Sequence, residues 1–394
     1  MKKMTKILTA VLTAGMTALT AIPFNVYAVE KNSSIVLLGD GVFTGAELPE
    51  GERSCAEILD SMTDAEIHNF ASDSATTADV LAQLDDSAVQ SALSGADVII
   101  VSAGMHDIFD PYIETAKEQL AKFESDYNWH LENITELFYM RPEDLGIDSD
   151  MVDALATEYT NPLARAARQN RNSAAENLEN IGQKLSAYPN AKVIYVNCFN
   201  IMDTLGNISE LSAKRQDSYN VVKRPVSSCL NSDKVNVNGA IRNNATNYGS
   251  IIIDTFSGFE GMAYEYSCLP ILTPNLSSAG HEWIALEILS AIGEDENSKV
   301  SETLKVGDAN CDGNIDAADA AKLLVHSANN GGGGVGYFGS YAQKIGNITA
   351  IGKILSEGET DAIDATDAAL ILQYAALQGS GQNADFAELV KQAG

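Results

Sequence analysis

Residues 35–45 read I-V-L-L-G-D-G-V-F-T-G, a short apolar run followed at once by a turn of glycine and aspartate. An apolar run of this length, bounded by turn residues, is typical of a strand buried on both faces of a sheet. A helix is expected next, over residues 55–62, so the strand is expected to belong to a parallel sheet. Asp40 and Gly41 would then lie at the carboxyl end of the strand, where functional groups gather in such sheets.

Four further apolar runs follow, at intervals that leave room for helices. We expect strands at residues 67–71, 97–102, 192–199 and 250–256, and helices at residues 76–84, within 113–187, at 237–247 and at 281–292. Strands that are apolar throughout, each followed by a helical segment, predict a parallel sheet with helices on both faces. The sequence therefore indicates an α/β domain over residues 29–300.

The segments that follow the strands resemble the sequence blocks of the SGNH (GDSL) hydrolases. In chain order they are VLLGDGVFTG (36–45), NFASDSATTADVL (69–81), VSAGMHD (101–107) and TPNLSSAGHEWIA (273–285). The order and spacing of the four blocks fit that family. The resemblance implies a three-layer, flavodoxin-like α/β fold of the SGNH-hydrolase type.

The catalytic positions depart from this resemblance. In the family, a first-block Ser is the nucleophile, and its backbone N–H forms an oxyanion hole with a second-block Gly and a third-block Asn. These three positions fall on Gly41, Ser74 and His106, while Gly104 and Asp107 keep the other third-block positions. Without its nucleophile, an acyl-transfer site keeps only binding and oxyanion stabilisation.

The base of the family, the His of an Asp-x-x-His pair, can be matched in two ways. If His281 is the base, Ser278 stands in place of the Asp. If the family's His-Pro segment instead matches T-P-N at residues 273–275, the base is lost and His281 is only a downstream residue. Either match leaves the set of nucleophile, base and orienting carboxylate incomplete.

Three roles therefore remain open for this domain. The first is a non-catalytic module that binds carbohydrate or assists other enzymes, which loss of the nucleophile favours. The second is a carbohydrate esterase, removing acetyl groups with a displaced nucleophile or an activated water, and the third is a structural unit. The candidate nucleophiles are Thr44, Ser72 and Ser74, and the other candidate catalytic residues are Asp40, His106, Asp107 and His281.

A second informative stretch, residues 308–319, reads D-A-N-C-D-G-N-I-D-A-A-D. Side-chain oxygens fall at loop positions 1, 3, 5, 9 and 12, and Gly313 stands at position 6, where the chain must turn sharply. This is the spacing of an EF-hand-type Ca²⁺ loop, with Asp in place of Glu at the last position. The predicted ligands are Asp308, Asn310, Asp312, Asp316 and Asp319, with the backbone carbonyl of Asn314.

Half of this loop and the helix after it are duplicated, because residues 315–328 (IDAADAAKLLVHSA) recur as residues 363–376 (IDATDAALILQYAA). A duplicated Ca²⁺ loop with its exit helix resembles a dockerin, a small all-α domain of EF-hand type, here at residues 301–394. The resemblance implies Ca²⁺, a scaffoldin cohesin as partner, and a role in plant cell-wall polysaccharide breakdown within a cellulosome. It assigns cohesin recognition to exposed helix positions, including Ala317, Ala318, Lys322 and Thr366.

The second copy differs from the first. Its loop has Ser356, Gly358 and Thr360 where the first copy has oxygen ligands at positions 1, 3 and 5, so it lacks carboxylates there. We therefore expect one good Ca²⁺ site and one weak or absent site. A glycine run at residues 331–334 lies in the insertion that separates the copies, and it reads as a flexible linker or loop.

The N-terminus and the composition indicate an exported protein. A basic start, an apolar stretch at residues 7–22 and V-Y-A at residues 26–28 predict a signal peptide over residues 1–28. The mature chain is expected to be secreted and to have no membrane span. The formal charge of −29 argues against nucleic acid as a partner. Five scattered cysteines, with no C-x-x-C pair, suggest neither a disulfide framework nor a zinc site.

Overall fold

The computed structural model describes residues 33–127, 160–204, 223–268, 273–293, 307–309, 314–331 and 365–393. Some features expected from the sequence lie outside these residues. They are the signal peptide, the loop residues Asn310 and Asp312, residues 332–334 of the glycine run, and the second loop with Ser356, Gly358 and Thr360.

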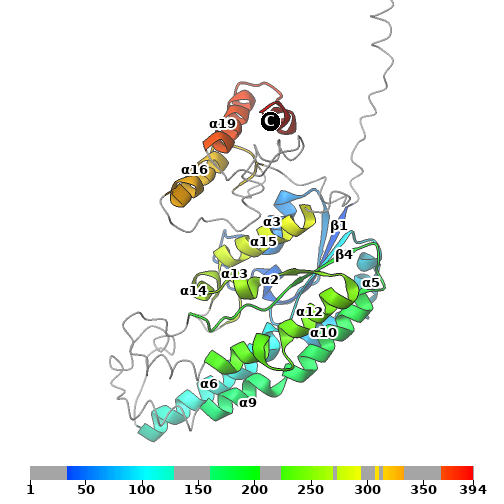
Figure 1. Cartoon of the computed structure of the whole chain (residues 1–394), viewed down its shortest axis with the longest axis vertical. Coiled ribbons are helices and arrows are strands. Elements are labelled where there is room, and N and C mark those ends of the chain that lie inside the picture. Colours follow the sequence, from blue (N-terminus) through cyan, green and yellow to red (C-terminus); the bar gives the residue numbers. More distant parts are fainter. Residues whose placement is uncertain are drawn as a thin grey trace, which may run out of the picture. The chain divides into compact units, whose positions relative to one another are not determined.

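Five parallel strands form one sheet, in the order β2-β1-β3-β4-β5 (Figure 1). The strands are β1 (Ser34–Gly39), β2 (Glu66–Asn69), β3 (Val98–Ser102), β4 (Lys192–Val196) and β5 (Ile251–Ile253). In the centre of the sheet, Leu37 lies opposite Ile100, which lies opposite Ile194. This strand order is the flavodoxin-like one, and its direction reverses between β1 and β3. Such a reversal leaves a crevice at the carboxyl ends of these two strands.

Helices cover both faces of the sheet, which makes three layers (Figure 1). Helices α3 (Cys55–Met62) and α15 (Ser278–Gly293) pack together on one face. Helices α4 (Thr77–Gln83), α10 (Arg171–Leu185) and α12 (Val237–Tyr248) cover the other. The other described helices of this domain are α2 (Gly41–Thr44), α5 (Ser87–Ser94), α6 (Met105–Tyr127), α9 (Thr160–Gln169), α13 (Thr255–Gly258), α14 (Ala263–Tyr266) and the π-helical turn η1 (Ser228–Ser232).

Burial and capping explain why these segments form these elements. Every residue of β1 and of β3 is buried, as expected for central parallel strands that are covered on both faces. Helix α3 begins with a capping box in which Ser54 and Glu57 bond each other's backbone N–H groups, and Thr76 and Asp79 do the same for α4. Such boxes satisfy N–H groups that the first turn of a helix leaves without partners.

Two glycines allow the ends of the central strands to approach closely. Gly39 has φ +139°, and a Cβ there would lie 1.9 Å from the carbonyl oxygen of Ser102. Gly104 has φ +114°, and a Cβ there would lie 2.5 Å from Val237 Cγ1. Both positions require glycine. The third-block Gly104 is therefore fixed by packing.

The predicted parallel α/β domain is confirmed, with differences at the ends of its elements. Strands β2 and β4 end earlier than expected, at Asn69 and Val196, and α15 begins earlier, at Ser278. Helix α5 was missed, because it buries only Val89 and Leu93 and so shows little periodicity in the sequence.

The described C-terminal residues form α16 (Ala317–Gly331), α19 (Ala365–Gly379) and α20 (Phe386–Ala393). Helix α16 packs against α19, and α19 packs against α20. Leu323 and Ile371 are fully buried, and the rings of Tyr374 and Phe386 meet edge to face with centroids 5.1 Å apart. The duplicated sequence thus forms two packed helices of similar length, each beginning at the repeated half-loop.

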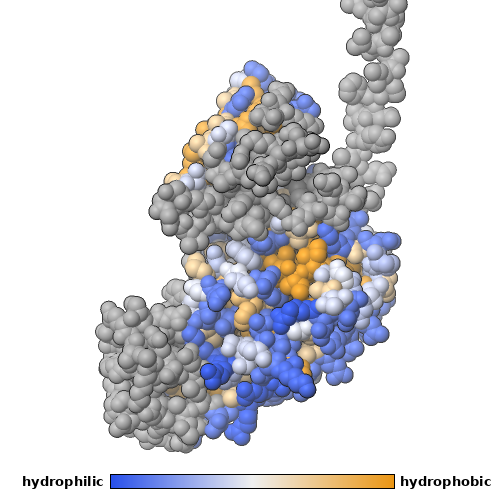
Figure 2. Space-filling model, in the orientation of Figure 1, coloured by the Kyte–Doolittle hydropathy of each residue, from blue (hydrophilic) through white to orange (hydrophobic). Residues whose placement is uncertain are grey.

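The surface of the described residues agrees with the acidic composition. Figure 2 shows a face of the α/β domain on which hydrophilic side chains dominate around one hydrophobic area, and further hydrophobic side chains lie among the C-terminal helices. None of the described helices combines the length and apolar character that crossing a bilayer requires.

Candidate functional site

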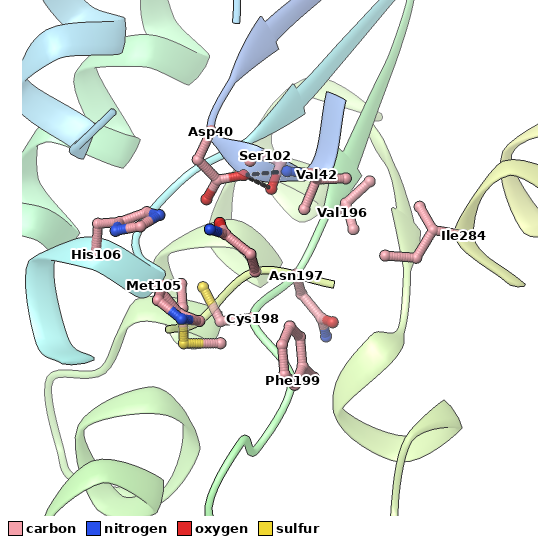
Figure 3. A pocket seen from close by; sticks show the side chains of 13 residues that line it. Asp40, Val42, Ser102, Met105, His106, Val196, Asn197, Cys198, Phe199 and Ile284 are labelled. Atoms are coloured by element: carbon pink, nitrogen blue, oxygen red, sulfur yellow. Dashed lines mark hydrogen bonds between the residues drawn. The ribbon is translucent and has the colours of Figure 1, made fainter. Parts of the chain in front are cut away.

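A pocket opens at the carboxyl ends of β1, β3 and β4, where the strand order reverses (Figure 3). It contains about 320 Å³ of empty space, part of which is open to solvent. Asp40 and His106, two residues singled out from the sequence, both line it. The other polar side chains that line it are Ser102, Asn197 and Asn275, and its apolar side chains include Met105, Phe199 and Ile284.

Asp40 follows β1 directly and is buried. Its Oδ1 accepts hydrogen bonds from the Ser102 hydroxyl (2.8 Å) and from the Val42 N–H (3.3 Å), and the second of these caps α2. Burial raises the pKa of this carboxyl, although the charge of His106 and the hydrogen bonds oppose the rise. Figure 3 shows the ring of His106 directed toward the carboxylate of Asp40.

The expected nucleophile position, Gly41, is closed by a neighbouring side chain. A Cβ at Gly41 would lie 2.2 Å from Oδ1 of Asn275 and 3.4 Å from the carbonyl oxygen of Asp73. Asn275 comes from the loop before α15 and is only 8% exposed, and its Oδ1 has no hydrogen-bond partner among the described residues. The amide oxygen of Asn275 thus occupies the space from which a serine side chain would start.

The position of this loop favours the second match of the last sequence block. Pro274 and Asn275 line the pocket beside Gly41, whereas His281 does not line it. In this match Thr273 stands in place of the catalytic His. Neither the nucleophile nor the base of the family then has a counterpart at this site.

His281 lies away from the residues that line the pocket, and it is 0% exposed. Its Nδ1 is 3.2 Å from the backbone nitrogen of Cys55 and 3.1 Å from the carbonyl oxygen of Val42, and its Nε2 has no hydrogen-bond partner in the part of the chain that the structure describes. Burial lowers its pKa to about 4, so the ring is neutral at pH 7. The structure does not bring His281 to Asp40; instead, it links α15 to the ends of α2 and α3.

His106 lies in the first turn of α6 and is buried. Its Nδ1 is 2.9 Å from Oδ2 of Asp110, one helical turn further on. Burial alone would lower the pKa of His106, but the hydrogen bond with Asp110 and the charges of Asp40, Asp110 and Asp107 outweigh it and raise the pKa. No ring nitrogen of His106 lies within 4.0 Å of an Asp40 oxygen, so these two side chains face each other without direct contact.

Two other residues of the family blocks, Asp107 and Ser74, do not line the pocket. Asp107 points away from the pocket and accepts hydrogen bonds from Thr77, from its N–H at 2.8 Å and its hydroxyl at 2.9 Å, at the start of α4. Burial raises the pKa of Asp107, and the bonds from Thr77 oppose the rise. Ser74 is exposed and does not line the pocket.

None of the substitute nucleophiles suggested by the sequence lines the pocket. Ser72, like Ser74, is exposed, and the hydroxyl of Thr44 accepts a hydrogen bond from the N–H of Ala46. Ser102 is the only hydroxyl side chain among the described pocket residues, and it donates to Asp40 rather than to an imidazole. The described pocket therefore has no hydroxyl activated by a histidine, which serine catalysis needs.

The sequence did not assign three residues that shape this site: Ser102, Asp110 and Asn275. Asp110 was missed because the helical region was expected to begin at residue 113, whereas α6 begins at Met105 and so places Asp110 one turn after His106. Asn275 lies within a recognised block, but its position over Gly41 depends on the path of the loop, which the sequence does not specify.

The calcium-loop residues that are described fit a cation site in part. Asp308 and Asp319 are fully buried, and Oδ2 of Asp319 accepts a hydrogen bond from the N–H of Asp316 at 2.8 Å. Buried carboxylates need compensation by hydrogen bonds or a cation, and oxygen donors of this kind suit Ca²⁺. The described residues contain no group of three metal-ligating side chains, and two of the expected ligands lie outside them.

The residues expected to recognise a cohesin lie on the described helices. Ala317, Ala318 and Thr366 are exposed in the first turns of α16 and α19, and Lys322 is partly buried on α16. Three of the four side chains are therefore accessible to a partner.

Comparisons with known proteins found similarity in structure but none in sequence. No protein-family model and no curated protein sequence matches the chain. A lipase from a goat rumen metagenome aligns with 66% of this chain and 97% of its own, at 15% identity and a TM-score of 0.36. An extracellular lipase from Streptomyces rimosus aligns with 66% of this chain and 99% of its own (17% identity, TM-score 0.42). An acetyl xylan esterase gives the same coverages at 14% identity and a TM-score of 0.33. Because these sequence identities and TM-scores are low, the chemistry of this chain has to be argued from its own residues.

Proposed function

We propose that the α/β domain is a non-catalytic relative of the SGNH hydrolases that works as a binding or accessory module. The observation that carries the proposal is the place of Asn275, whose Oδ1 lies 2.2 Å from where a Cβ of residue 41 would be. The site thus lacks the nucleophile and also fills the nucleophile's space. The presence of Thr273 at the expected position of the base supports the same conclusion.

We further propose that the chain is secreted and is anchored through its C-terminal helices to a cohesin of a scaffoldin, in a complex that degrades plant polysaccharides. The support is the residue spacing of the loop at 308–319 and its duplication, together with the packing of α16 against α19. The side chains that would hold Ca²⁺ are those of Asp308, Asn310, Asp312, Asp316 and Asp319, with the carbonyl of Asn314. The ion would neutralise these carboxylates and hold the loop against the start of α16.

One alternative has an observation in its favour. The Asp110 carboxylate bonds Nδ1 of His106 and so orients the ring, which leaves Nε2 for the pocket (Figure 3). An imidazole oriented in this way can act as a general base toward water. A hydrolase that activates water directly, without a covalent intermediate, is therefore the second candidate function.

Hydrolysis by the full-length chain decides between the two. We expect no release of p-nitrophenol from p-nitrophenyl acetate or of acetate from acetylated xylan, and no labelling by a fluorophosphonate. Gly41→Ser should remain inactive, because it restores a hydroxyl but no base, and Gly41→Ala is its matched control for packing. Hydrolysis by the wild-type chain that is lost in His106→Gln would establish the alternative. Fluorophosphonate labelling of the wild type would show a relocated nucleophile and refute both.

A further inference from the structure

We infer that α20, the helix at residues 386–393, helps to hold the Ca²⁺ loop in place, because its Phe386 packs on the residue before the first ligand. The inference deepens the proposed function and rests on it, since it takes the loop at 308–319 to be the cation site. It assigns Phe386 as a positioning residue for that site, not as a ligand.

The ring of Phe386 lies against the backbone of Gly307. A Cβ at residue 307 would lie 2.5 Å from Cε1 and 2.7 Å from Cζ of this ring, so only glycine leaves room for it. Gly307 also has φ +101°, a backbone conformation that favours glycine. Residues 307–309 are all buried, and Asp308 is fully so. The ring therefore covers the turn that leads into the first predicted ligand.

Helices α19 and α20 together place Phe386 at this turn. Phe386 is the first residue of α20, and the Asp385 carboxylate before it accepts a hydrogen bond from the N–H of Glu388 at 3.4 Å. Helix α20 packs against α19, and Figure 1 shows it beside that helix. The ring of Tyr374 on α19 meets the ring of Phe386 edge to face. Phe386 thus joins the helix of the second repeat to the start of the loop of the first.

Helix α20 is too short to be stable by itself. It has eight residues, and isolated helices of fewer than about 12 residues are marginal in water. Its order therefore depends on the packing of its buried side chains, which include Phe386 and Val390. Because Phe386 packs on Gly307, a loop that opened at this residue would remove part of the surface that α20 needs.

Ca²⁺ binding should be coupled to this contact. Asp308 and Asp319 are buried carboxylates at loop positions 1 and 12, and a bound Ca²⁺ would offset the free-energy cost of burying their charges. The ion thus favours the closed loop, and the closed loop favours the docked α20. Coupling of this kind is reciprocal. Docking of α20 should therefore raise the affinity for Ca²⁺, and Ca²⁺ should order α20.

The test is the Ca²⁺ affinity of the full-length chain, measured by calorimetry after bound ions have been removed with a chelator. Phe386→Ala should weaken Ca²⁺ binding by about tenfold, within the range usual for coupled sites. Gly307→Ala should also weaken it, because the methyl group displaces the ring, but this effect should shrink when Phe386 is already Ala. Gly381→Ala is the matched control for backbone strain, since Gly381 has φ +77° and a Cβ there has no neighbour within 4 Å. It should weaken Ca²⁺ binding less than Gly307→Ala does.

Hydrogen exchange of the backbone amides gives a second readout that does not depend on the affinity. In the wild type, Ca²⁺ should slow exchange in both α16 and α20. In Phe386→Ala, saturating Ca²⁺ should still slow exchange in α16 but no longer in α20. A residue that only filled space between α19 and α20 would leave the Ca²⁺ affinity unchanged when it was replaced.

Three outcomes would overturn the inference and leave the proposed Ca²⁺ loop standing. The first is Ca²⁺ binding by Phe386→Ala as tight as by the wild type. The second is an effect of Gly307→Ala that is undiminished in the Phe386→Ala background or equalled by Gly381→Ala. The third is full protection of α20 by Ca²⁺ in Phe386→Ala. Failure of the wild type itself to bind Ca²⁺ would refute the proposed cation site, and the inference with it.

Discussion

The contact between residue 41 and Asn275 can be measured by a double-mutant cycle. Gly41→Ala adds a Cβ that would lie 2.2 Å from Oδ1 of Asn275, so one of the two must move. Overpacking of this kind costs roughly 1–3 kcal/mol of folding free energy. Asn275→Ala removes an oxygen that has no partner but also some packing, so its own effect should lie within about 1 kcal/mol of zero.

The double variant should recover most of the loss, because the added methyl group then enters the space that the amide has left. We expect a coupling free energy of about 1–2 kcal/mol between the two positions, from urea unfolding followed by circular dichroism at saturating Ca²⁺. Gly95→Ala is the matched control, since a Cβ there has its nearest neighbour at 3.9 Å, and its effect should add to that of Asn275→Ala. Additivity within about 0.5 kcal/mol for the Gly41 pair would refute the view that Asn275 occupies the nucleophile's space.

Three further predictions concern stability. The pKa of His281 is about 4 in the folded chain and 6.5 in the unfolded one, so only the unfolded chain binds this proton between those values. Stability should fall by up to roughly 3 kcal/mol as the pH drops through this window, and His281→Asn should remove that slope in urea titrations. Asp107→Ala should cost about 2 kcal/mol in the same assay, because Thr77 loses two hydrogen bonds; an unchanged stability would contradict the capping role. Chelation of Ca²⁺ by EGTA should reduce helical circular dichroism in the wild type and have no effect in Asp308→Ala, whose signal should already be low.

The fold could be predicted from the sequence because its signals are local. Each central strand is an apolar run closed by a turn, and each run is followed by a helical segment, so the parallel sheet follows from the order of the elements. Helix α5 was not predicted, because only Val89 and Leu93 of this helix are buried. The strands were predicted to end too late in the sequence. In β4, for example, the apolar run continues through Cys198 and Phe199 after the strand has ended at Val196.

The candidate site could be predicted only in part. Asp40 follows β1 directly and His106 lies in the first turn of the helix after β3, so the sheet itself brings them to one edge. The last block was ambiguous, because its two matches differ by the residues between Thr273 and His281, and only the path of the loop shows that Asn275 reaches Gly41. The burial of His281 could not be deduced either, because it depends on the packing of α15 against α2 and α3.

Asp40 holds the first turn of α2 and the end of β3 through a single carboxylate oxygen, while the other oxygen faces the pocket. These two structural contacts account for the buried carboxylate without any catalytic role. In a library of random substitutions, changes at Asp40 should be depleted by selection for folding alone, whether or not any ligand is present. Asn275 should tolerate replacement under the same selection, because its Oδ1 makes no hydrogen bond within the described residues. The difference between these two substitution profiles would separate a residue that the architecture requires from one that it only accommodates.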